Sequence, residues 1–144
     1  MKAQLINDKG EKTWIVVFDK GDEVKAGLLQ FARENNLGAA RLTAIGAFSD
    51  VTLGYFDRDR KEYKKIPLRE QVEVLSLIGD IAVKEDGAPA VHAHVVVGRS
   101  DATTRGPHLL EAHVWPTLEV IVDEAPAHLR KKSAPETGLA LINL

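Results

Sequence analysis

The chain has 144 residues, of which 44% are hydrophobic and 28% charged, and its formal net charge at pH 7 is −2. This composition is typical of one globular domain spanning residues 1–144. The absence of cysteine excludes disulfides, thiolate metal sites and cysteine nucleophiles. The mild negative charge argues against a dedicated nucleic-acid binder, which normally has a basic excess. No segment resembles a signal peptide or the ~20 apolar residues of a membrane span, so the expected location is the cytoplasm.

The N-terminal part of the chain predicts a strand followed by the main helix. Residues 14–18 are an apolar run that ends at polar turn residues, as a strand does. A helix is predicted at residues 22–36, with Asp22 as its N-cap and Gly38 just past its end. Its apolar residues recur with helical spacing, which predicts a stripe that packs on a sheet.

Everything after Gly38 predicts β-structure. A polar turn at residues 57–60 predicts a hairpin, and Gly79 inside an apolar strand indicates a bulge or a close backbone approach. Residues 130–136 are expected to form a surface loop. The predicted strands after the helix cover residues 41–46, 51–56, 62–68, 71–83, 91–98, 118–123 and 139–144. Short connections predict an α+β domain with a mostly antiparallel sheet of about seven strands and one main helix packed on it.

The strongest chemical signal is the pair His92 and His94 within residues 91–98. Side chains alternate across a strand, so valines and an alanine occupy one face and the two histidines the other. The histidines are then roughly 7 Å apart along the strand. At that separation two imidazoles can bind one metal ion, although such pairs also make ordinary hydrogen bonds at surfaces and subunit interfaces.

A third ligand is needed, and His108 is the best candidate among the remaining histidines. The segment before it is long enough to fold back past the end of the strand, and Gly106 and Pro107 favour a sharp turn. Three histidines and a water would give a tetrahedral Zn²⁺ site with one open position. His113 is expected to be packed or at an interface, and His128 to be solvent-exposed.

The order and spacing of several motifs resemble the plant- and prokaryote-conserved (PPC) domain family, from about residue 12 to the end of the chain. In the family the third histidine usually follows two glycines, and here Pro107 replaces the second. The matching segments are residues 44–55, which look like its Gly-x-x-Ser motif, 73–79, the His-x-His strand, 106–110 and 118–122.

This resemblance implies properties that composition does not show. Similar domains have an antiparallel sheet with a helix packed on it, and they assemble as homotrimers. The histidines matching His92, His94 and His108 lie together near a subunit boundary and look like a metal site. In plants the domain is joined to an AT-hook, a DNA-binding element with the sequence Arg-Gly-Arg-Pro, which is not present in this sequence. Stand-alone prokaryotic members have no settled function to transfer.

The sequence is compatible with three functions. The first is a trimeric metal-binding module, zinc being the expected metal, that acts through a protein partner or a small ligand at a subunit boundary. Arg41, Ser49 and Glu73 are candidate polar groups for that ligand, although Ser49 can equally shape a turn and Glu73 form a surface ion pair.

The second function is a hydrolase or lyase that uses a three-histidine zinc. Glu111 and Glu119 are the nearest acids to such a site in sequence, but nothing fixes either there, so a non-enzymatic role is favoured.

The third function is DNA binding. A stretch at residues 58–65 contains five basic residues, but acidic residues interrupt it, which favours a solvated hairpin. Together with the net charge of −2 and the missing AT-hook, this makes nucleic-acid binding the least favoured of the three functions.

Overall fold

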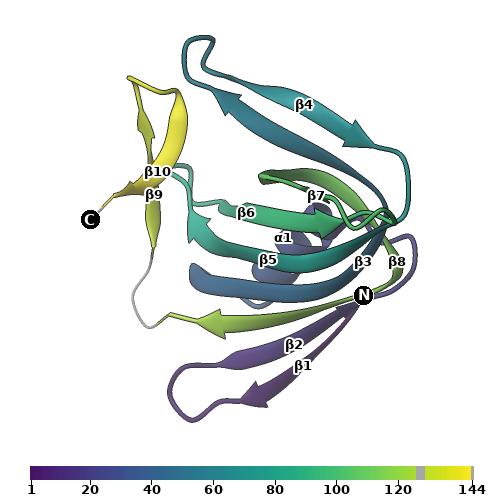
Figure 1. Cartoon of the computed structure of the whole chain (residues 1–144). Helices are drawn as coiled ribbons and strands as arrows, with labels where there is room; N and C mark the ends of the chain where they lie inside the picture. Colours follow the sequence, from purple (N-terminus) through teal and green to yellow (C-terminus); the bar gives the residue numbers. More distant parts are fainter. Residues whose placement is uncertain (126–128, 144) are drawn as a thin grey trace.

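Ten strands in one curled sheet and one helix make up the computed structural model, which describes residues 1–125 and 129–143. Along the main path the strand order is β1-β2-β8-β3-β5-β6-β7, with β4 paired to β3 and the β9–β10 hairpin attached to β5 (Figure 1). The elements are β1 (Lys2–Asn7), β2 (Thr13–Phe18), α1 (Val24–Glu34), β3 (Ala39–Asp57), β4 (Glu62–Leu68), β5 (Val72–Val83), β6 (Pro89–Gly98), β7 (Thr104–Arg105), β8 (His108–Glu124), β9 (Arg130–Ala134) and β10 (Leu139–Asn143).

The sheet therefore has more strands than the seven predicted, and it is mixed rather than purely antiparallel. The β5–β9 pairing at Val83 and Arg130 is parallel, whereas the other pairings are antiparallel within the described residues. The strands that the sequence did not predict are short or lack alternation: β1 is exposed along its whole length, and β7 has two residues. The prediction of a loop at residues 130–136 was wrong, because β9 pairs there with β10.

Helix α1 covers one face of the sheet and contacts β6 and β8. Val24, Leu28 and Phe31 are fully or almost fully buried, as the apolar stripe predicted. The helix is shorter than predicted. Its N-cap is Glu23, whose carboxylate accepts hydrogen bonds from the backbone N–H groups of the first turn, whereas Asp22 pairs with the N-terminal ammonium group.

Two long, bent strands, β3 and β8, form the middle of the sheet. Residues 41–46 and 51–56, predicted as separate strands, are parts of β3, and residues 118–123 are the last part of β8. Gly46 permits the bend because its φ is +152°, and a Cβ there would lie 2.7 Å from the Cα of Leu118. A hairpin joins β3 to β4, as predicted, with its turn at residues 58–61 rather than 57–60.

Gly79 marks a close backbone approach between β5 and β6. A Cβ at this position would lie 3.0 Å from the Cα of Ala93 and would overlap the carbonyl oxygen of His92. The bulge itself falls elsewhere on β5, between Val74 and Ser76. The absence of a side chain at Gly79 therefore lets β5 support the strand that carries the histidine pair. Within the described residues, no helix is long and apolar enough to cross a membrane.

Candidate metal centre

The two histidines on β6 lie on the outer face of the sheet, opposite the helix. Val91, Ala93 and Val95 are buried in the core, whereas His92 and His94 are exposed between them. The period-two alternation of the sequence is thus confirmed. Because the apolar face is packed against the core, the backbone that carries the two imidazoles is firmly held.

His108 joins the pair because the sheet curls until β8 meets β6. It is the first residue of β8 and forms a single bridge with His94, which brings the two histidines directly opposite each other. The backbone N–H of Val95 donates a hydrogen bond to the carbonyl oxygen of Pro107 at 2.7 Å. The contact between β6 and the start of β8 is therefore also held by the residues next to the two histidines. Proline at the position that is usually glycine in the family is compatible with this placement of His108.

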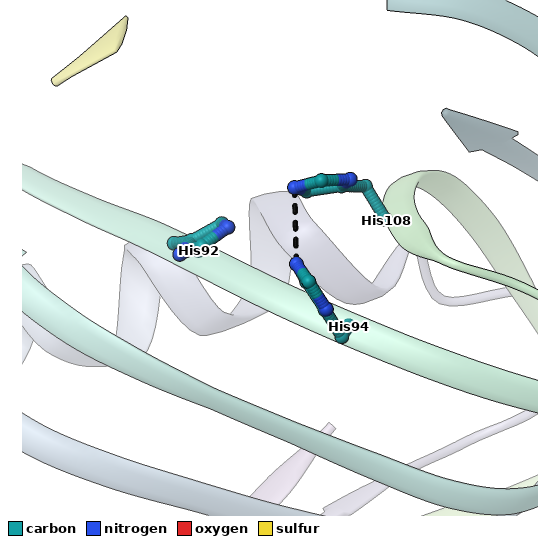
Figure 2. A group of neighbouring side chains, drawn as sticks. All are labelled: His92, His94 and His108. Carbon is teal, nitrogen blue, oxygen red and sulfur yellow. Dashed lines mark hydrogen bonds between the residues drawn. The ribbon is translucent and has the colours of Figure 1, made fainter. Parts of the chain in front are cut away.

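The three imidazoles point toward one another (Figure 2). One potential ligand nitrogen from each of His92, His94 and His108 lies within 4.8 Å of the other two. The Nε2 atoms of His94 and His108 are 3.0 Å apart. Two nitrogens bound to one tetrahedral zinc ion at ~2.05 Å are about 3.3 Å apart. This pair is therefore close to the spacing that a shared metal requires.

Hydrogen bonding determines which nitrogen of His108 is free. Its Nδ1 lies 3.1 Å from the carbonyl oxygen of Gly54, and a carbonyl only accepts, so Nδ1 carries the proton. The Nε2 lone pair of the neutral ring then faces the cluster. Burial is the largest effect on the pKa of both His94 and His108 and lowers each below the usual value for histidine. The neutral, metal-binding form is favoured in both.

An ion pair between Asp80 and the buried Lys131 lies next to His92. The Nδ1 atom of His92 is 3.6 Å from a carboxylate oxygen of Asp80 on β5, and the other oxygen of Asp80 contacts the ammonium of Lys131 on β9. The Lys131 side chain is only 4% exposed. Burial raises the pKa of Asp80, but the neighbouring His92 and the charged Lys131 lower it by more, so the net shift is downward. Asp80 is thus an ionised carboxylate that can orient a metal-binding histidine.

Sequence reasoning missed both Asp80 and Lys131. Asp80 is an acid in the last, otherwise apolar part of β5, next to Gly79, which was an available signal for a specific role. Lys131 is flanked by other basic residues, and nothing in its local pattern distinguishes it from a solvated lysine. Tyr63 on β4 was also missed: its ring stands edge-on to His108 with centroids 4.9 Å apart and forms an aromatic wall beside the cluster.

Of the three candidate ligand-binding residues, only Arg41 lies beside the histidines. It lines a pocket of about 460 Å³ together with His92 and His94. Ser49 lines a different cleft, where its hydroxyl donates to the carboxylate of Asp50 at 2.8 Å. The structure therefore does not bring these three polar groups into one site.

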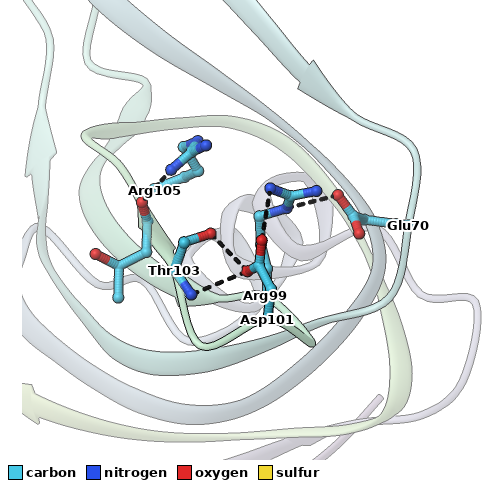
Figure 3. A network of polar contacts seen from close by, with 6 residues as sticks. Glu70, Arg99, Asp101, Thr103 and Arg105 are labelled. Carbon is cyan, nitrogen blue, oxygen red and sulfur yellow. Dashed lines mark hydrogen bonds and ion pairs between the residues drawn. The ribbon is translucent and has the colours of Figure 1, made fainter.

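Glu73 lines a third cleft, at the turn between β6 and β7. Figure 3 shows the polar network of this turn. Arg99 contacts Glu70 at 2.8 Å and Asp101 at 3.5 Å, and the backbone N–H and hydroxyl of Thr103 both donate to Asp101. These contacts fix the wall of the cleft and involve none of the three histidines.

The other two predictions about histidines have different outcomes. His113 is partly buried and contacts Asp50 through its Nδ1 atom at 2.9 Å, and this hydrogen bond raises its pKa above the usual value. It lies outside the cluster. The prediction that His128 is exposed concerns a residue outside the described part of the chain. Glu111 lines the cleft of Ser49, and Glu119 lines an apolar pocket with Ile45, so neither lines the histidine pocket.

A family model described as the Plants and Prokaryotes Conserved (PCC) domain matches residues 6–126. The chain belongs to this family. A plant- and prokaryote-conserved (PPC) protein from Pyrococcus horikoshii is 30% identical, with a TM-score of 0.86 over 99% of this chain and 95% of that protein. No curated protein has a matching sequence.

Two other solved PPC-like structures carry functional descriptions. A protein from Archaeoglobus fulgidus described as metal-containing is 30% identical, with a TM-score of 0.85 over 100% of this chain and 99% of that one. A protein from Ralstonia eutropha JMP134, described only provisionally as DNA-binding, is 32% identical, with a TM-score of 0.84 over 91% of this chain and 90% of that one. Fold and family are thus shown, and the histidine cluster lies within the matched residues.

Proposed function

We propose that this PPC protein binds a divalent transition metal through His92, His94 and His108, and that the metal is zinc. The observation that carries the proposal is the convergence of three imidazole nitrogens within 4.8 Å of one another. Neutral imidazoles suit zinc and related first-row metals. The metal-containing relative from Archaeoglobus fulgidus supports the same reading.

Oxygen atoms next to two of the ligand histidines also support the proposal. A metal-binding histidine usually donates its other ring N–H to a carbonyl or carboxylate, which fixes the ring and its tautomer. His108 has the carbonyl of Gly54 as such a partner, and the carboxylate of Asp80 lies 3.6 Å from Nδ1 of His92, next to the ring. Three histidines would leave one coordination position open, where a metal binds or polarises an oxygen ligand or lowers the pKa of water.

Metal analysis with matched variants tests the site. Purified protein is expected to contain about one zinc per chain, and the double variant His92→Ala/His94→Ala to contain none, since one remaining imidazole holds a metal weakly. His113→Ala is the control, because this histidine lies outside the cluster, and its metal content should equal that of the wild type. Wild-type protein that is isolated without metal and takes up no zinc on titration would overturn the proposal.

We further propose that the protein is a homotrimer and acts through a small ligand or a protein partner at the subunit boundary. The support is an unusual amount of apolar surface on the outer face of the sheet, which association would remove from water. Ile45 is 62% exposed and Ile78 58%, and Ile121 is 43% exposed beside them.

Light scattering tests the trimer. The expected mass is three times the 15.8 kDa of one chain. Ile45→Glu should reduce the mass to that of the monomer, because it places a charge on the apolar face, whereas Ile142→Glu on the C-terminal hairpin should not. A wild-type protein that remains monomeric at micromolar concentration would contradict this part of the proposal.

DNA binding is a second candidate, favoured by the basic hairpin between β3 and β4 and by the description of the Ralstonia protein. The hairpin extends away from the rest of the sheet (Figure 1). If the hairpin contacts phosphates, affinity for random duplex DNA should fall steeply as salt rises. No binding at low salt would reject this candidate.

A further inference from the structure

The pocket beside the histidines lies where two rows of side chains cross the sheet. In the first row Thr13, Asp123, Arg41, Asp80 and His92 are paired in succession on β2, β8, β3, β5 and β6. Directly paired residues of antiparallel strands project from the same face. This polar row therefore leads from the edge of the sheet to the proposed metal site.

The second row is mainly apolar and runs beside the first. Ile121, Thr43, Ile78 and His94 are paired in succession on β8, β3, β5 and β6. The pocket of about 460 Å³ lies over both rows, since its lining includes Arg41, Asp80 and His92 from one, and Thr43, Ile78 and His94 from the other. One wall is thus charged and the other contains an exposed isoleucine.

Arg41 is held so that part of its guanidinium remains free. Its Nε donates to one carboxylate oxygen of Asp123 at 2.9 Å, and the other oxygen accepts from the hydroxyl of Thr13 at 2.9 Å. The structure gives no partner to the two terminal nitrogens of Arg41 within its described residues. A guanidinium that is anchored through Nε and has free terminal N–H groups is suited to a two-point contact with a carboxylate.

The charged residues around the pocket balance one another, so a bound metal ion would decide its net charge. Among the described residues, Asp80 is the only carboxylate in the lining, and Lys131 neutralises it. Arg41 is balanced by Asp123, which is not part of the lining. A divalent cation on neutral imidazoles would therefore give the pocket a net positive charge. Arg41 and His92 are two strand spacings apart, or about 10 Å between backbones, and the arginine side chain shortens that gap.

We propose that this pocket binds a short-chain hydroxy acid, with the carboxylate on Arg41, the carbon chain over Ile78 and the hydroxyl toward the histidine cluster. The inference rests on the proposed metal site. A single arginine fork beside an apolar wall fits a carboxylate with a hydrocarbon chain better than a phosphate, which needs several donors.

Titration calorimetry on the zinc-loaded protein tests the proposal. The probe is 3-hydroxybutyrate, compared with 1,3-butanediol, which lacks the carboxylate, and butyrate, which lacks the hydroxyl. The wild type should bind 3-hydroxybutyrate at least about tenfold more tightly than either analogue, because each analogue loses one anchoring interaction. Equal affinity for all three, or no binding, would overturn the proposal.

The variant Arg41→Gln should lose the preference for 3-hydroxybutyrate over the diol and keep its zinc content, because Arg41 is not one of the three histidines of the cluster. Its melting temperature should change little, because an ion pair of an arginine that is 80% exposed adds little stability. Arg41→Lys should recover only part of the preference, because lysine lacks the fork. Arg58→Gln is the control, since Arg58 lies at the hairpin tip and is 92% exposed; this variant should bind 3-hydroxybutyrate as the wild type does.

Unchanged carboxylate binding in Arg41→Gln would reject the ligand assignment and leave the proposed metal site unaffected. Failure of the wild type to take up zinc would reject both.

Discussion

The buried pair of Lys131 and Asp80 gives the sharpest test of how the C-terminal hairpin supports the histidine cluster. Lys131→Met keeps most of the apolar volume of the side chain but removes its charge. Removing one partner of a fully buried pair costs about 3–5 kcal/mol. Asp80 remains 22% exposed, so water recovers part of that loss, and we expect the free energy of unfolding to fall by about 2–3 kcal/mol.

Urea denaturation at pH 7 measures this change. Lys132→Met is a matched control, because the neighbouring lysine on β9 is exposed, and it should alter the stability by no more than about 0.5 kcal/mol. The double variant Lys131→Met/Asp80→Asn should recover part of the loss, since no unpaired carboxylate remains. Equal stability of the Lys131 and Lys132 variants, or strict additivity in the double variant, would refute the assignment.

Three further predictions concern the backbone, the metal and pH. Gly79→Ala should cost about 1–3 kcal/mol of stability in the same denaturation assay, because the new methyl group meets the backbone of β6. Metal retention, measured by dialysis at decreasing pH, should persist below pH 6.5, because burial lowers the pKa of His94 and of His108 from that value and protons compete for the ligand nitrogens; full release above that pH would contradict it. The hydrogen bond between Asp50 and His113 raises the pKa of the histidine and lowers that of the aspartate. Its stabilising effect should be complete between about pH 4 and pH 6.5, and it should fade as the pH rises through the raised histidine pKa or falls through the lowered aspartate pKa. The stability deficit of His113→Asn should follow this profile and stay below about 1 kcal/mol, because both groups are more than a third exposed; a deficit independent of pH would refute the ion pair.

Local periodicity was sufficient to predict the helix and the orientation of His92 and His94. Both depend on which face of one element is apolar, and that information lies within a few neighbouring residues. The length of the segment before His108 made this residue a candidate, and the family resemblance predicted that it lies beside the pair. This proximity arises physically from the curl of the sheet, which brings the first residue of β8 to β6, and no local pattern encodes that contact.

The features that the sequence did not predict also depend on contacts between distant segments of the chain. Strand β9 begins with the four polar residues Arg130, Lys131, Lys132 and Ser133, so its composition resembles that of a solvated loop. Only the pairing of Lys131 with Asp80 shows that one of these lysines is buried. Similarly, β3 has a bulge at Gly46, between its two halves. In the sequence this glycine resembles the end of a strand, so the two halves were predicted as separate strands.

The central claim is that three histidines hold one metal ion, and anomalous diffraction measures this most directly. Crystals of the zinc-loaded protein, with data collected on both sides of the zinc absorption edge, should show one strong peak per chain, bonded to nitrogens of His92, His94 and His108 at about 2.0–2.1 Å. A strong peak at other residues, or no peak at the three histidines in protein saturated with zinc, would contradict the account.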